Sequence, residues 1–441
     1  MTLSSIAPWT QYDQLIHCAK TIKPYGRVVQ VIGLVIEGIG PLSAIGEMCH
    51  IKRRSDEKPI PSEVVGFREN KMLLMPLDAT RGIEPGCPII PMGSPAKAFV
   101  GSHLLGRVLD GLGNPIDHQG PLICDEEYPI YAESPHPLMR QRISEPVDVG
   151  IRSINALLTL GKGQRIAIFS GSGVGKSTLL GMMARHTKAQ VNIVALIGER
   201  GREVREFIEK DLGQKGLERS VVIVATSDQH PLVRIRGAYL ATTLAEYFRD
   251  QGNDVLLMMD SITRFAMASR EVGLAIGEPP TAKGYTPSVF AQLPKLLERV
   301  GMTPDRGNIT GIYNVLVEAD DVNDPIADAI RSIADGHIVL SRELANQNHY
   351  PSIDVLGSIS RVMPDIVGKD QLAARNKLVS LMATYKKAED LIQIGAYIEG
   401  SNSQIDEAIK KMPEINRFLC QEIHEKVNFE DSVHHLKSLF T

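Results

Sequence analysis

A glycine-rich segment between an apolar run and a helix-forming run constrains this sequence more than any other feature. Residues 166–169 are apolar and β-prone, and residues 178–185 favour a helix. The glycines at positions 171, 173 and 175 can adopt positive φ, so that successive backbone N–H groups face one concavity. The N-terminus of the helix adds partial positive charge there. A strand, a glycine-rich turn and a helix in this order predict a phosphate-binding loop.

Two polar residues follow the glycines, and both suit a bound nucleotide. Lys176 can reach the β- and γ-phosphates, and the hydroxyl of Ser177 can bind Mg²⁺. Ser170 stands where the usual pattern has its first glycine, which a negative φ at that position allows. The alternative is an ordinary glycine-rich turn with a chance lysine, and the flanking strand and helix count against it. The residues predicted to contact the nucleotide here are Ser170, Gly171, Ser172, Gly173, Val174, Gly175, Lys176, Ser177 and Thr178.

The composition limits the kind of protein that carries this loop. A chain of 441 residues with 43% hydrophobic and 23% charged residues is expected to form two or three domains. The net charge of −4 gives no general electrostatic case for binding nucleic acid or an anionic membrane. The five cysteines are far apart and lack metal-binding spacing, so we expect reduced thiols in a cytoplasmic protein. We expect neither a signal peptide nor a membrane span.

The pattern of strands and helices predicts an α/β fold with three parts. Residues 1–92 are expected to form a short amphipathic helix and a small β-barrel, because short β-rich runs alternate with turn residues. Residues 93–365 are expected to form the second part, in which β-prone runs alternate with helical ones from about 150 to 360 and predict a mostly parallel sheet covered by helices. Residues 366–441 are expected to form a helical domain.

Several ranges specify these expectations. The N-terminal helix, near residues 10–20, could pack on its own domain or dock a partner. The C-terminal part is helix-forming from 370 to 426, with breaks at Gly395 and Gly400. The β-rich runs of the barrel are 27–36, 64–67 and 71–76, and the strands expected in the central part are 166–169, 192–197, 221–225, 255–259 and 309–317.

Carboxylates end two of the expected central strands. Asp260 closes an apolar run, so we expect it beside the phosphate loop, where it would bind Mg²⁺; the alternative is a helix N-cap. Glu199 follows another buried run and is the candidate base for the attacking water, as well as a metal-side carboxylate. Burial would raise the pKa of Glu199, whereas Arg200 and Arg202 would lower it. An exposed charged loop is an equally good interpretation of this segment.

Four further segments resemble one family of ATPases. The sequence is similar to the hexameric ATPases related to the α and β subunits of the rotary ATP synthase, with a P-loop (RecA-like) central domain. Within that family it resembles the flagellar type III protein export ATPases, whose nearest relatives are the virulence (injectisome) export ATPases. The segments that carry the wider resemblance are 106–117, 198–203, 279–285 and 350–361, the last with the P-S-I-D-x-x-x-S-x-S signature. Residues 180–185 and 394–397 favour the flagellar branch.

The resemblance implies a role for each matching residue. Lys176 and Ser177 match the phosphate-loop pair, Glu199 the catalytic glutamate and Asp260 the metal-side aspartate. The remaining matches are Arg200 beside the glutamate, Arg264 one helical turn after the aspartate, Tyr350 as the aromatic that stacks on adenine, and Arg361 as the arginine finger. The aromatic pair that encloses adenine from the C-terminal domain of ATP synthase has no clear match.

The resemblance also implies partners. Because Glu199 and Arg361 occur in one chain, a homohexameric ring would hold equivalent sites between subunits. The family implies a negative regulator on the N-terminal helix, a coiled-coil stalk protein, chaperone–substrate complexes and the membrane export gate. It thereby implies a cytoplasmic protein at the inner membrane through its partners. ATP and Mg²⁺ are the implied substrate and cofactor.

Three other functions share parts of this pattern. The first is a catalytic subunit of a rotary ATPase, which would work in a hetero-ring. The second is an RNA-translocating ring helicase, disfavoured because residues 1–100 contain few aromatics for stacking bases. The third is a ring scaffold that binds ATP without turnover, disfavoured by the full set of Lys176, Glu199, Asp260 and Arg361.

Overall fold

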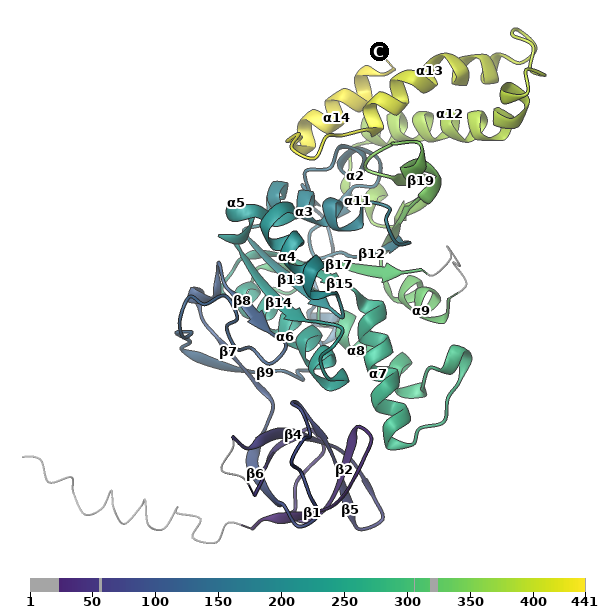
Figure 1. Ribbon diagram of the computed structural model, residues 1–441. Helices are drawn as coiled ribbons and strands as arrows, with labels where there is room; N and C mark the ends of the chain where they lie inside the picture. The colour runs from purple at the N-terminus through teal and green to yellow at the C-terminus, as the bar shows by residue number, and fades with distance from the viewer. Residues whose placement is uncertain (1–23, 55–57, 305, 318–323, 441) are drawn as a thin grey trace, which may run out of the picture. The chain divides into compact units, whose positions relative to one another are not determined.

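The computed structural model describes residues 24–54, 58–304, 306–317 and 324–440 (Figure 1). The chain divides into two compact units, one ending at Pro95 and the other beginning at Ala96. The first unit contains a closed barrel with the strand order β1-β2-β5-β4-β3-β6. Its strands are β1 (Gly26–Ile32), β2 (Val35–Ile39), β3 (Glu47–Ile51), β4 (Ile60–Arg68), β5 (Lys71–Pro76) and β6 (Pro88–Pro95).

The barrel confirms the predicted all-β part of the chain. β1 pairs with β6, so every strand has two neighbours and the sheet has no free edge. The run expected at 27–36 is two strands, because Gly33 adopts a φ of 56° in the turn between them. The helix expected near residues 10–20 lies outside the described residues. The inward side chains are Val28, Ile36, Cys49, Ile51, Ile60, Val64, Met72, Leu74, Cys87 and Ile89.

The second unit is built on a mostly parallel sheet, as predicted. Its strand order is β19-β18-β12-β17-β15-β13-β14-β8, and β19 runs antiparallel to its neighbour. The short β16 (Gly301–Met302) pairs antiparallel with β17. All expected central strands are present, with bounds within one residue of expectation. The other strands of the sheet are β8 (Val108–Asp110), β12 (Arg165–Ser170), β13 (Val191–Ile197), β14 (Ser220–Ala225), β15 (Asp254–Asp260), β17 (Asn308–Leu316), β18 (Gly336–Leu340) and β19 (Ile353–Ser360).

Helices cover both faces of this sheet, which is why β13 and β14 are buried along their whole length. None of the helices within the described ranges is long and apolar enough to cross a membrane. The helices of this part are α2 (Arg152–Leu157), α3 (Lys176–His186), α4 (Gly201–Glu206), the π-helical η3 (Phe207–Leu212), α5 (Gly213–Leu217), α6 (Pro231–Asp250), α7 (Ile262–Ile276), α8 (Pro287–Leu297), α9 (Pro325–Ile333), α10 (Arg342–Asn346) and α11 (Met363–Ile366). Short pieces join them: the pairs β7 (Lys97–Val100) with β9 (Glu126–Pro129) and β10 (Pro146–Val147) with β11 (Leu160–Gly161), and the 3-10 turns η1 (Ser102–Leu104), η2 (Pro137–Met139) and η4 (Ala282–Gly284).

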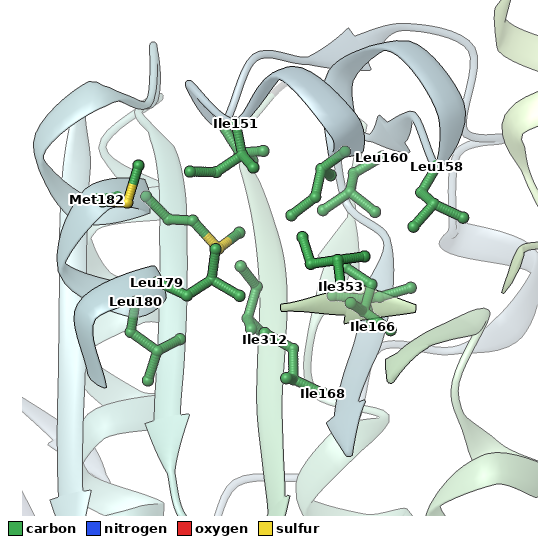
Figure 2. Packing of buried hydrophobic residues seen from close by; sticks show 14 of the residues in the cluster. Ile151, Leu158, Leu160, Ile166, Ile168, Leu179, Leu180, Met182, Ile312 and Ile353 are labelled. Carbon is green, nitrogen blue, oxygen red and sulfur yellow. The ribbon is translucent and has the colours of Figure 1, made fainter. Parts of the chain in front are cut away.

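The apolar core fixes the position of α3, the helix that follows the glycine-rich loop. Leu179 and Met182 of α3 belong to the same buried cluster as Ile166 and Ile312 on the sheet and Ile353 on β19 (Figure 2). All five side chains are at most 3% exposed. Close packing of this kind leaves α3 little freedom to shift relative to the strands.

Three helices end the chain: α12 (Lys369–Gln393), α13 (Ser403–Leu419) and α14 (Phe429–Ser438). Figure 1 shows α12 and α13 side by side. The predicted break around Gly395 and Gly400 is confirmed, since both adopt positive φ between the two helices. The expectation of helix up to residue 426 was wrong, because α13 ends at Leu419. α14 was not predicted as a separate helix, although Asn428 caps it and Glu430 and Asp431 lie in its first turn.

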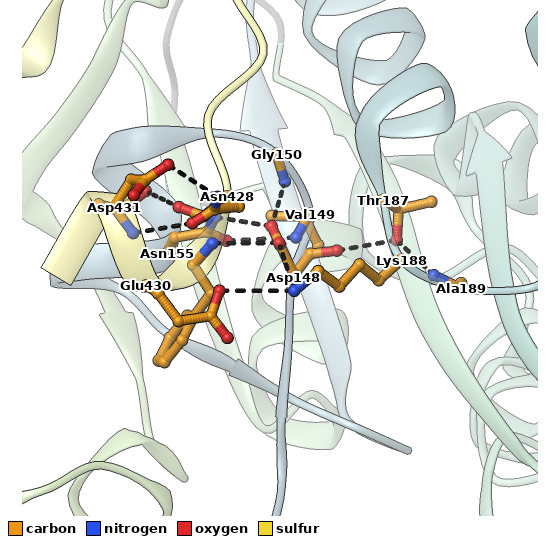
Figure 3. Close-up of polar contacts among 12 residues, drawn as sticks. Asp148, Val149, Gly150, Asn155, Thr187, Lys188, Ala189, Asn428, Glu430 and Asp431 are labelled. Carbon is orange, nitrogen blue, oxygen red and sulfur yellow. Dashed lines mark hydrogen bonds and ion pairs between the residues drawn. The ribbon is translucent and has the colours of Figure 1, made fainter.

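Asp148 attaches α14 to the central part of the chain (Figure 3). Its Oδ2 accepts a hydrogen bond from the backbone N–H of Phe429, at the start of α14, at 3.0 Å. Its Oδ1 accepts from Asn155 at 2.8 Å and from the N–H of Gly150 at 2.9 Å. A carboxylate at a helix N-terminus is favourable, so this contact orients α14 against α2. The expected boundary at residue 365 stays a prediction, since the C-terminal helices lie in the same compact unit as the sheet.

Candidate active site

The glycine-rich loop joins β12 to α3 at the carboxyl edge of the parallel strands. Ser170 is the last residue of β12, so its backbone is extended and requires no glycine. Gly173 and Gly175 adopt φ of 77° and 87°, whereas Gly171, also expected to allow positive φ, does not adopt it. Gly175 is the N-cap of α3 and offers no side chain to its first N–H groups. These donors are therefore available to a phosphate.

Lys176 lies between two carboxylates that come from other strands. Its Nζ donates to Oδ1 of Asp260 at 2.7 Å and to Oε1 of Glu199 at 3.2 Å. Asp260 ends β15, and Glu199 follows the neighbouring β13. The carboxyl ends of parallel strands meet at one edge, so the fold brings together three residues distant in sequence. The side chain of Lys176 is 13% exposed, that of Glu199 12% and that of Asp260 4%.

Asp260 does not cap the following helix, so that alternative was wrong. Ser261 is the N-cap of α7, and its hydroxyl accepts from the N–H of Arg264 at 3.3 Å. The peptide bond between Asp260 and Ser261 is cis. The carboxylate of Asp260 faces Lys176. Its Oδ1 also accepts from the amide of Asn314 on β17, at 3.0 Å.

Burial and charge oppose one another in this group. Burial acts to lower the pKa of Lys176, but the charges of Asp260 and Glu199 outweigh it and the pKa lies above its ordinary value. Burial raises the pKa of Glu199 to about 7, the charge of Asp260 adds to the rise, and Lys176 opposes it. A carboxylate that titrates near neutrality can accept a proton from water and release it again.

The neighbours of Glu199 and Asp260 are placed less centrally. Arg200 is exposed and pairs with Glu203 at 3.2 Å, so the charged-loop interpretation describes this arginine and not Glu199, whose side chain is only 12% exposed. Arg264 lies against Gly198, where an added Cβ would come within 2.7 Å of the arginine Cβ. Its Nη1 contacts the sulfur of Met267 at 3.5 Å, and its Nε is buried without a hydrogen-bond partner.

The oxygen atoms at this edge fit Mg²⁺. Mg²⁺ prefers oxygen ligands and is usually held by one or two carboxylates together with substrate phosphates. Asp260, Glu199 and the hydroxyl of Ser177 in the first turn of α3 are donors of this kind. Among the described residues, no group of three or more His, Cys, Asp and Glu side chains could hold a metal by itself.

A cavity of about 1020 Å³ continues from the loop. Tyr350 borders it and covers Gly175, since an added Cβ on that glycine would lie 3.3 Å from Cε1 of the ring. The hydroxyl of Ser352 donates to the backbone oxygen of Val174 at 2.6 Å, which ties the Tyr350 segment to the loop. Leu179 of α3 lines the same cavity. The position of Tyr350 suits an aromatic base attached to phosphates on the loop.

The C-terminal wall of the cavity is a segment that sequence reasoning missed. It comprises residues 420–425, between α13 and α14, with Arg417 and His435 beside it. The backbone N–H of Gln421 donates to the oxygen of Tyr350 at 2.9 Å. Its side chain accepts from the N–H of Arg152 at 2.7 Å and donates to the oxygen of Gly150 at 2.9 Å. Residues 420–425 contain no Phe, Tyr or Trp, so this segment offers no aromatic pair to enclose the base.

Arg361 lies at the other edge of the sheet. It follows β19, and its backbone N–H donates to the oxygen of Asp335, whose own N–H donates to Arg165 at the start of β12. The loop begins at the far end of β12, about 17 Å along the strand at roughly 3.3 Å per residue. The exposed guanidinium donates to the oxygen of Arg331 at 3.3 Å. Arg361 thus does not belong to the group around Lys176 of its own chain.

A phosphate loop, two strand-end carboxylates and a base-sized cavity on a mostly parallel sheet define a P-loop nucleotide-binding protein. Three family models match the chain. They are the ATP synthase alpha/beta family β-barrel domain at residues 28–93, its nucleotide-binding domain at 150–360, and the T3SS EscN ATPase C-terminal domain at 367–438. The flagellum-specific ATP synthase of Bacillus subtilis (strain 168) is 54% identical over 433 residues, which cover 97% of this chain and 98% of that protein.

Solved structures agree with these matches. The assembled ATPase EscN from the type III secretion system of enteropathogenic E. coli is 46% identical, with a TM-score of 0.89 and coverage of 94% of this chain and 99% of that one. EscN in complex with its central stalk EscO gives a TM-score of 0.87 at 45% identity, with the same coverage. The chain belongs to the ATP synthase alpha/beta family, in the branch of the flagellum-specific ATP synthases and the type III secretion ATPases.

Proposed function

We propose that this chain hydrolyses ATP to ADP and phosphate. The phosphates of ATP would bind on the loop, and its adenine would lie beside Tyr350. The observation that carries the proposal is the position of Lys176 between Glu199 and Asp260 at the N-terminus of α3. Lys176 would exchange its carboxylate partners for the β- and γ-phosphates. Glu199 would accept the proton of the water that attacks the γ-phosphorus, and ADP would leave in line. Mg²⁺, held by Ser177 and Asp260, would neutralise charge on the phosphates.

The site is completed, in our proposal, by a second copy of the chain. Arg361 supports this, because it is exposed at the sheet edge opposite to its own loop. Head-to-tail contacts between identical chains close into rings when the rotation permits, and the structure of the assembled ATPase EscN supports self-assembly of this chain. An arginine finger is typically worth about 10³ to 10⁵ in rate, roughly 4 to 7 kcal/mol. An isolated monomer would therefore hydrolyse ATP poorly.

Mixing two inactive variants tests the shared site. Glu199→Gln keeps Arg361, and Arg361→Ala keeps Glu199, so a mixed ring contains some interfaces with both groups intact. With random assembly at equal amounts, roughly a quarter of the interfaces are complete. We expect each variant alone to be inactive and the mixture to recover a comparable fraction of the wild-type rate. No recovery in rings shown by native mass spectrometry to be mixed would contradict the proposal.

The biological role proposed is energising or gating type III protein export during flagellar assembly. The 54% identity to a flagellum-specific ATP synthase and the match to a type III secretion C-terminal domain support it. The partners proposed are a coiled-coil stalk protein, chaperone–substrate complexes, a negative regulator and the membrane export gate. The EscN–EscO complex supports the stalk. The protein would act in the cytoplasm, at the inner membrane through these partners.

Complementation distinguishes the flagellar role from the alternatives. In a strain that lacks its own gene for this chain, the wild-type chain should restore filament assembly and motility, and Glu199→Gln should not. The alternative of a virulence secretion ATPase predicts instead that secretion through a needle complex is restored. A catalytic subunit of a rotary ATPase would show no activity as a homo-oligomer, which purification of the chain alone would reveal.

A further inference from the structure

Asn314 is a buried polar residue in the middle of the sheet that no role above explains. It lies on β17, between β12, which leads to the phosphate loop, and β15, which ends at Asp260. It pairs with Ile168 of β12, while its neighbour Tyr313 pairs with Met259 of β15. This register brings the side chain of Asn314 beside that of Asp260. Asn314 is fully buried.

The amide of Asn314 makes one strong contact and leaves one atom unmatched. Its Nδ2 donates to Oδ1 of Asp260 at 3.0 Å, the oxygen that also accepts from Lys176 at 2.7 Å. Its Oδ1 is buried and has no hydrogen-bond partner. A buried amide with an unmatched oxygen costs free energy in a sheet interior, where an apolar side chain would pack without that cost. The hydrogen bond to Asp260 is the favourable contact that an asparagine makes at this position and an apolar residue would not.

We propose that Asn314 is a positioning residue for Asp260, which holds one carboxylate oxygen toward the phosphate loop and leaves the other free for the metal side of the nucleotide. A neutral donor suits this task because it orients the carboxylate without adding a positive charge that would repel Mg²⁺. The inference rests on the proposed function, since it assumes that Asp260 serves Mg²⁺.

The test compares ADP binding with and without Mg²⁺ in Asn314→Leu and in wild-type protein, by calorimetry on the full chain. Leucine has a similar branched shape, donates nothing and removes the unmatched oxygen. Removing an outer partner of a metal ligand typically costs about 10- to 100-fold in metal affinity. We therefore expect the gain in ADP affinity from Mg²⁺ to fall by about tenfold or more, while binding in EDTA and the thermal midpoint of the nucleotide-free protein do not fall.

Asn192 provides a matched control. It is also a fully buried asparagine on a central strand with an unmatched Oδ1, but its amide donates to Ala184 and Ser220, away from the loop. Asn192→Leu should lower the thermal midpoint and leave the Mg²⁺-dependent gain unchanged. An equal loss of that gain in both variants would show a general effect on the sheet and would overturn the proposal.

The remaining outcomes are also decisive. An unchanged Mg²⁺-dependent gain in Asn314→Leu and in the smaller Asn314→Ala would overturn the role of Asn314. Failure of both variants to fold would overturn it too, because the asparagine would then be needed by the sheet itself. If wild-type protein shows no Mg²⁺-dependent gain, the proposed metal role of Asp260 fails, and this result is distinct from a failure of Asn314 alone.

Discussion

The ammonium group of Lys176 lies 2.7 Å from Oδ1 of Asp260, although the two residues come from segments separated in the sheet by β17. The same ammonium donates to Glu199 at 3.2 Å. One ammonium group thus joins two carboxylates that lie at the ends of neighbouring strands. In the proposed function, phosphate binding replaces these contacts, and the replacement would free Glu199 for water and Asp260 for the metal.

The substitution Lys176→Met, which removes the positive charge, should destabilise the nucleotide-free protein and abolish ATP binding. The variant leaves the buried Asp260 and the largely buried Glu199 without their cation, and breaking a buried pair typically costs about 3–5 kcal/mol. The loss should grow as the pH rises above the ordinary carboxylate range, because Glu199 then ionises beside Asp260 without the cation that opposes the rise of its pKa. Urea unfolding at pH 5 and pH 8 measures this.

Lys188→Met is the control for that prediction. Lys188 also bridges two carboxylates, Asp148 at 3.7 Å and Glu430 at 3.4 Å, but its side chain is 62% exposed. Exposed pairs are worth about 0–1 kcal/mol, so this variant should change stability little. If the two lysine variants lose equal stability, burial does not make the ion pairs of Lys176 stronger than the exposed pairs of Lys188, and the prediction is contradicted.

The stability of the nucleotide-free protein should depend on pH through Glu199. Burial first, and then the charge of Asp260, raise its pKa from an ordinary 4.5 to about 7. The folded protein therefore binds more protons than the unfolded chain between these values, and this group makes stability fall as the pH rises from 4.5 to 7. Glu199→Gln removes that contribution, so the variant should gain stability relative to wild type across this window. A constant difference between the two proteins from pH 4.5 to 8 would contradict the raised pKa.

Turnover should respond to the same substitution in a different way. A positioned general base contributes typically about 10² to 10⁴ in rate, so Glu199→Gln should lose that much in kcat. ATP binding should remain, because the amide keeps the shape of the side chain and Lys176 is untouched. Steady-state hydrolysis and nucleotide binding on one preparation separate the two effects. Unchanged turnover would remove Glu199 as the base.

The sequence alone was sufficient to predict those site residues whose position depends on a local pattern. The loop from Ser170 to Lys176 is recognisable because its glycines, lysine and flanking strand are contiguous. Glu199 and Asp260 were predicted correctly to lie at one edge, because an apolar strand followed by a carboxylate places that carboxylate wherever parallel strands end.

Residues that act through tertiary register could not be found in this way. Asn314 lies inside an ordinary β-prone run, and its contact with Asp260 depends on the pairing of β17 with β15. The position of Arg361 depends on β19 being antiparallel, a direction that no local pattern specified. Gln421 lies in a short segment that was expected to be helical. Its partners Gly150 and Arg152 are more than 250 residues away along the chain.

The C-terminal wall of the cavity should be needed for nucleotide affinity, and Gln421→Ala tests it. The side chain is 5% exposed and bonds the backbone of Gly150, Arg152 and Glu425, so its loss leaves buried groups unpaired at about 1–3 kcal/mol. The segment that also holds the backbone of Tyr350 would loosen, and ATP affinity should fall along with thermal stability. Gln404→Ala is the control, since Gln404 is exposed at the start of α13. If Gln421→Ala lowers stability but binds ATP as tightly as Gln404→Ala, the wall supports the fold without shaping the nucleotide site.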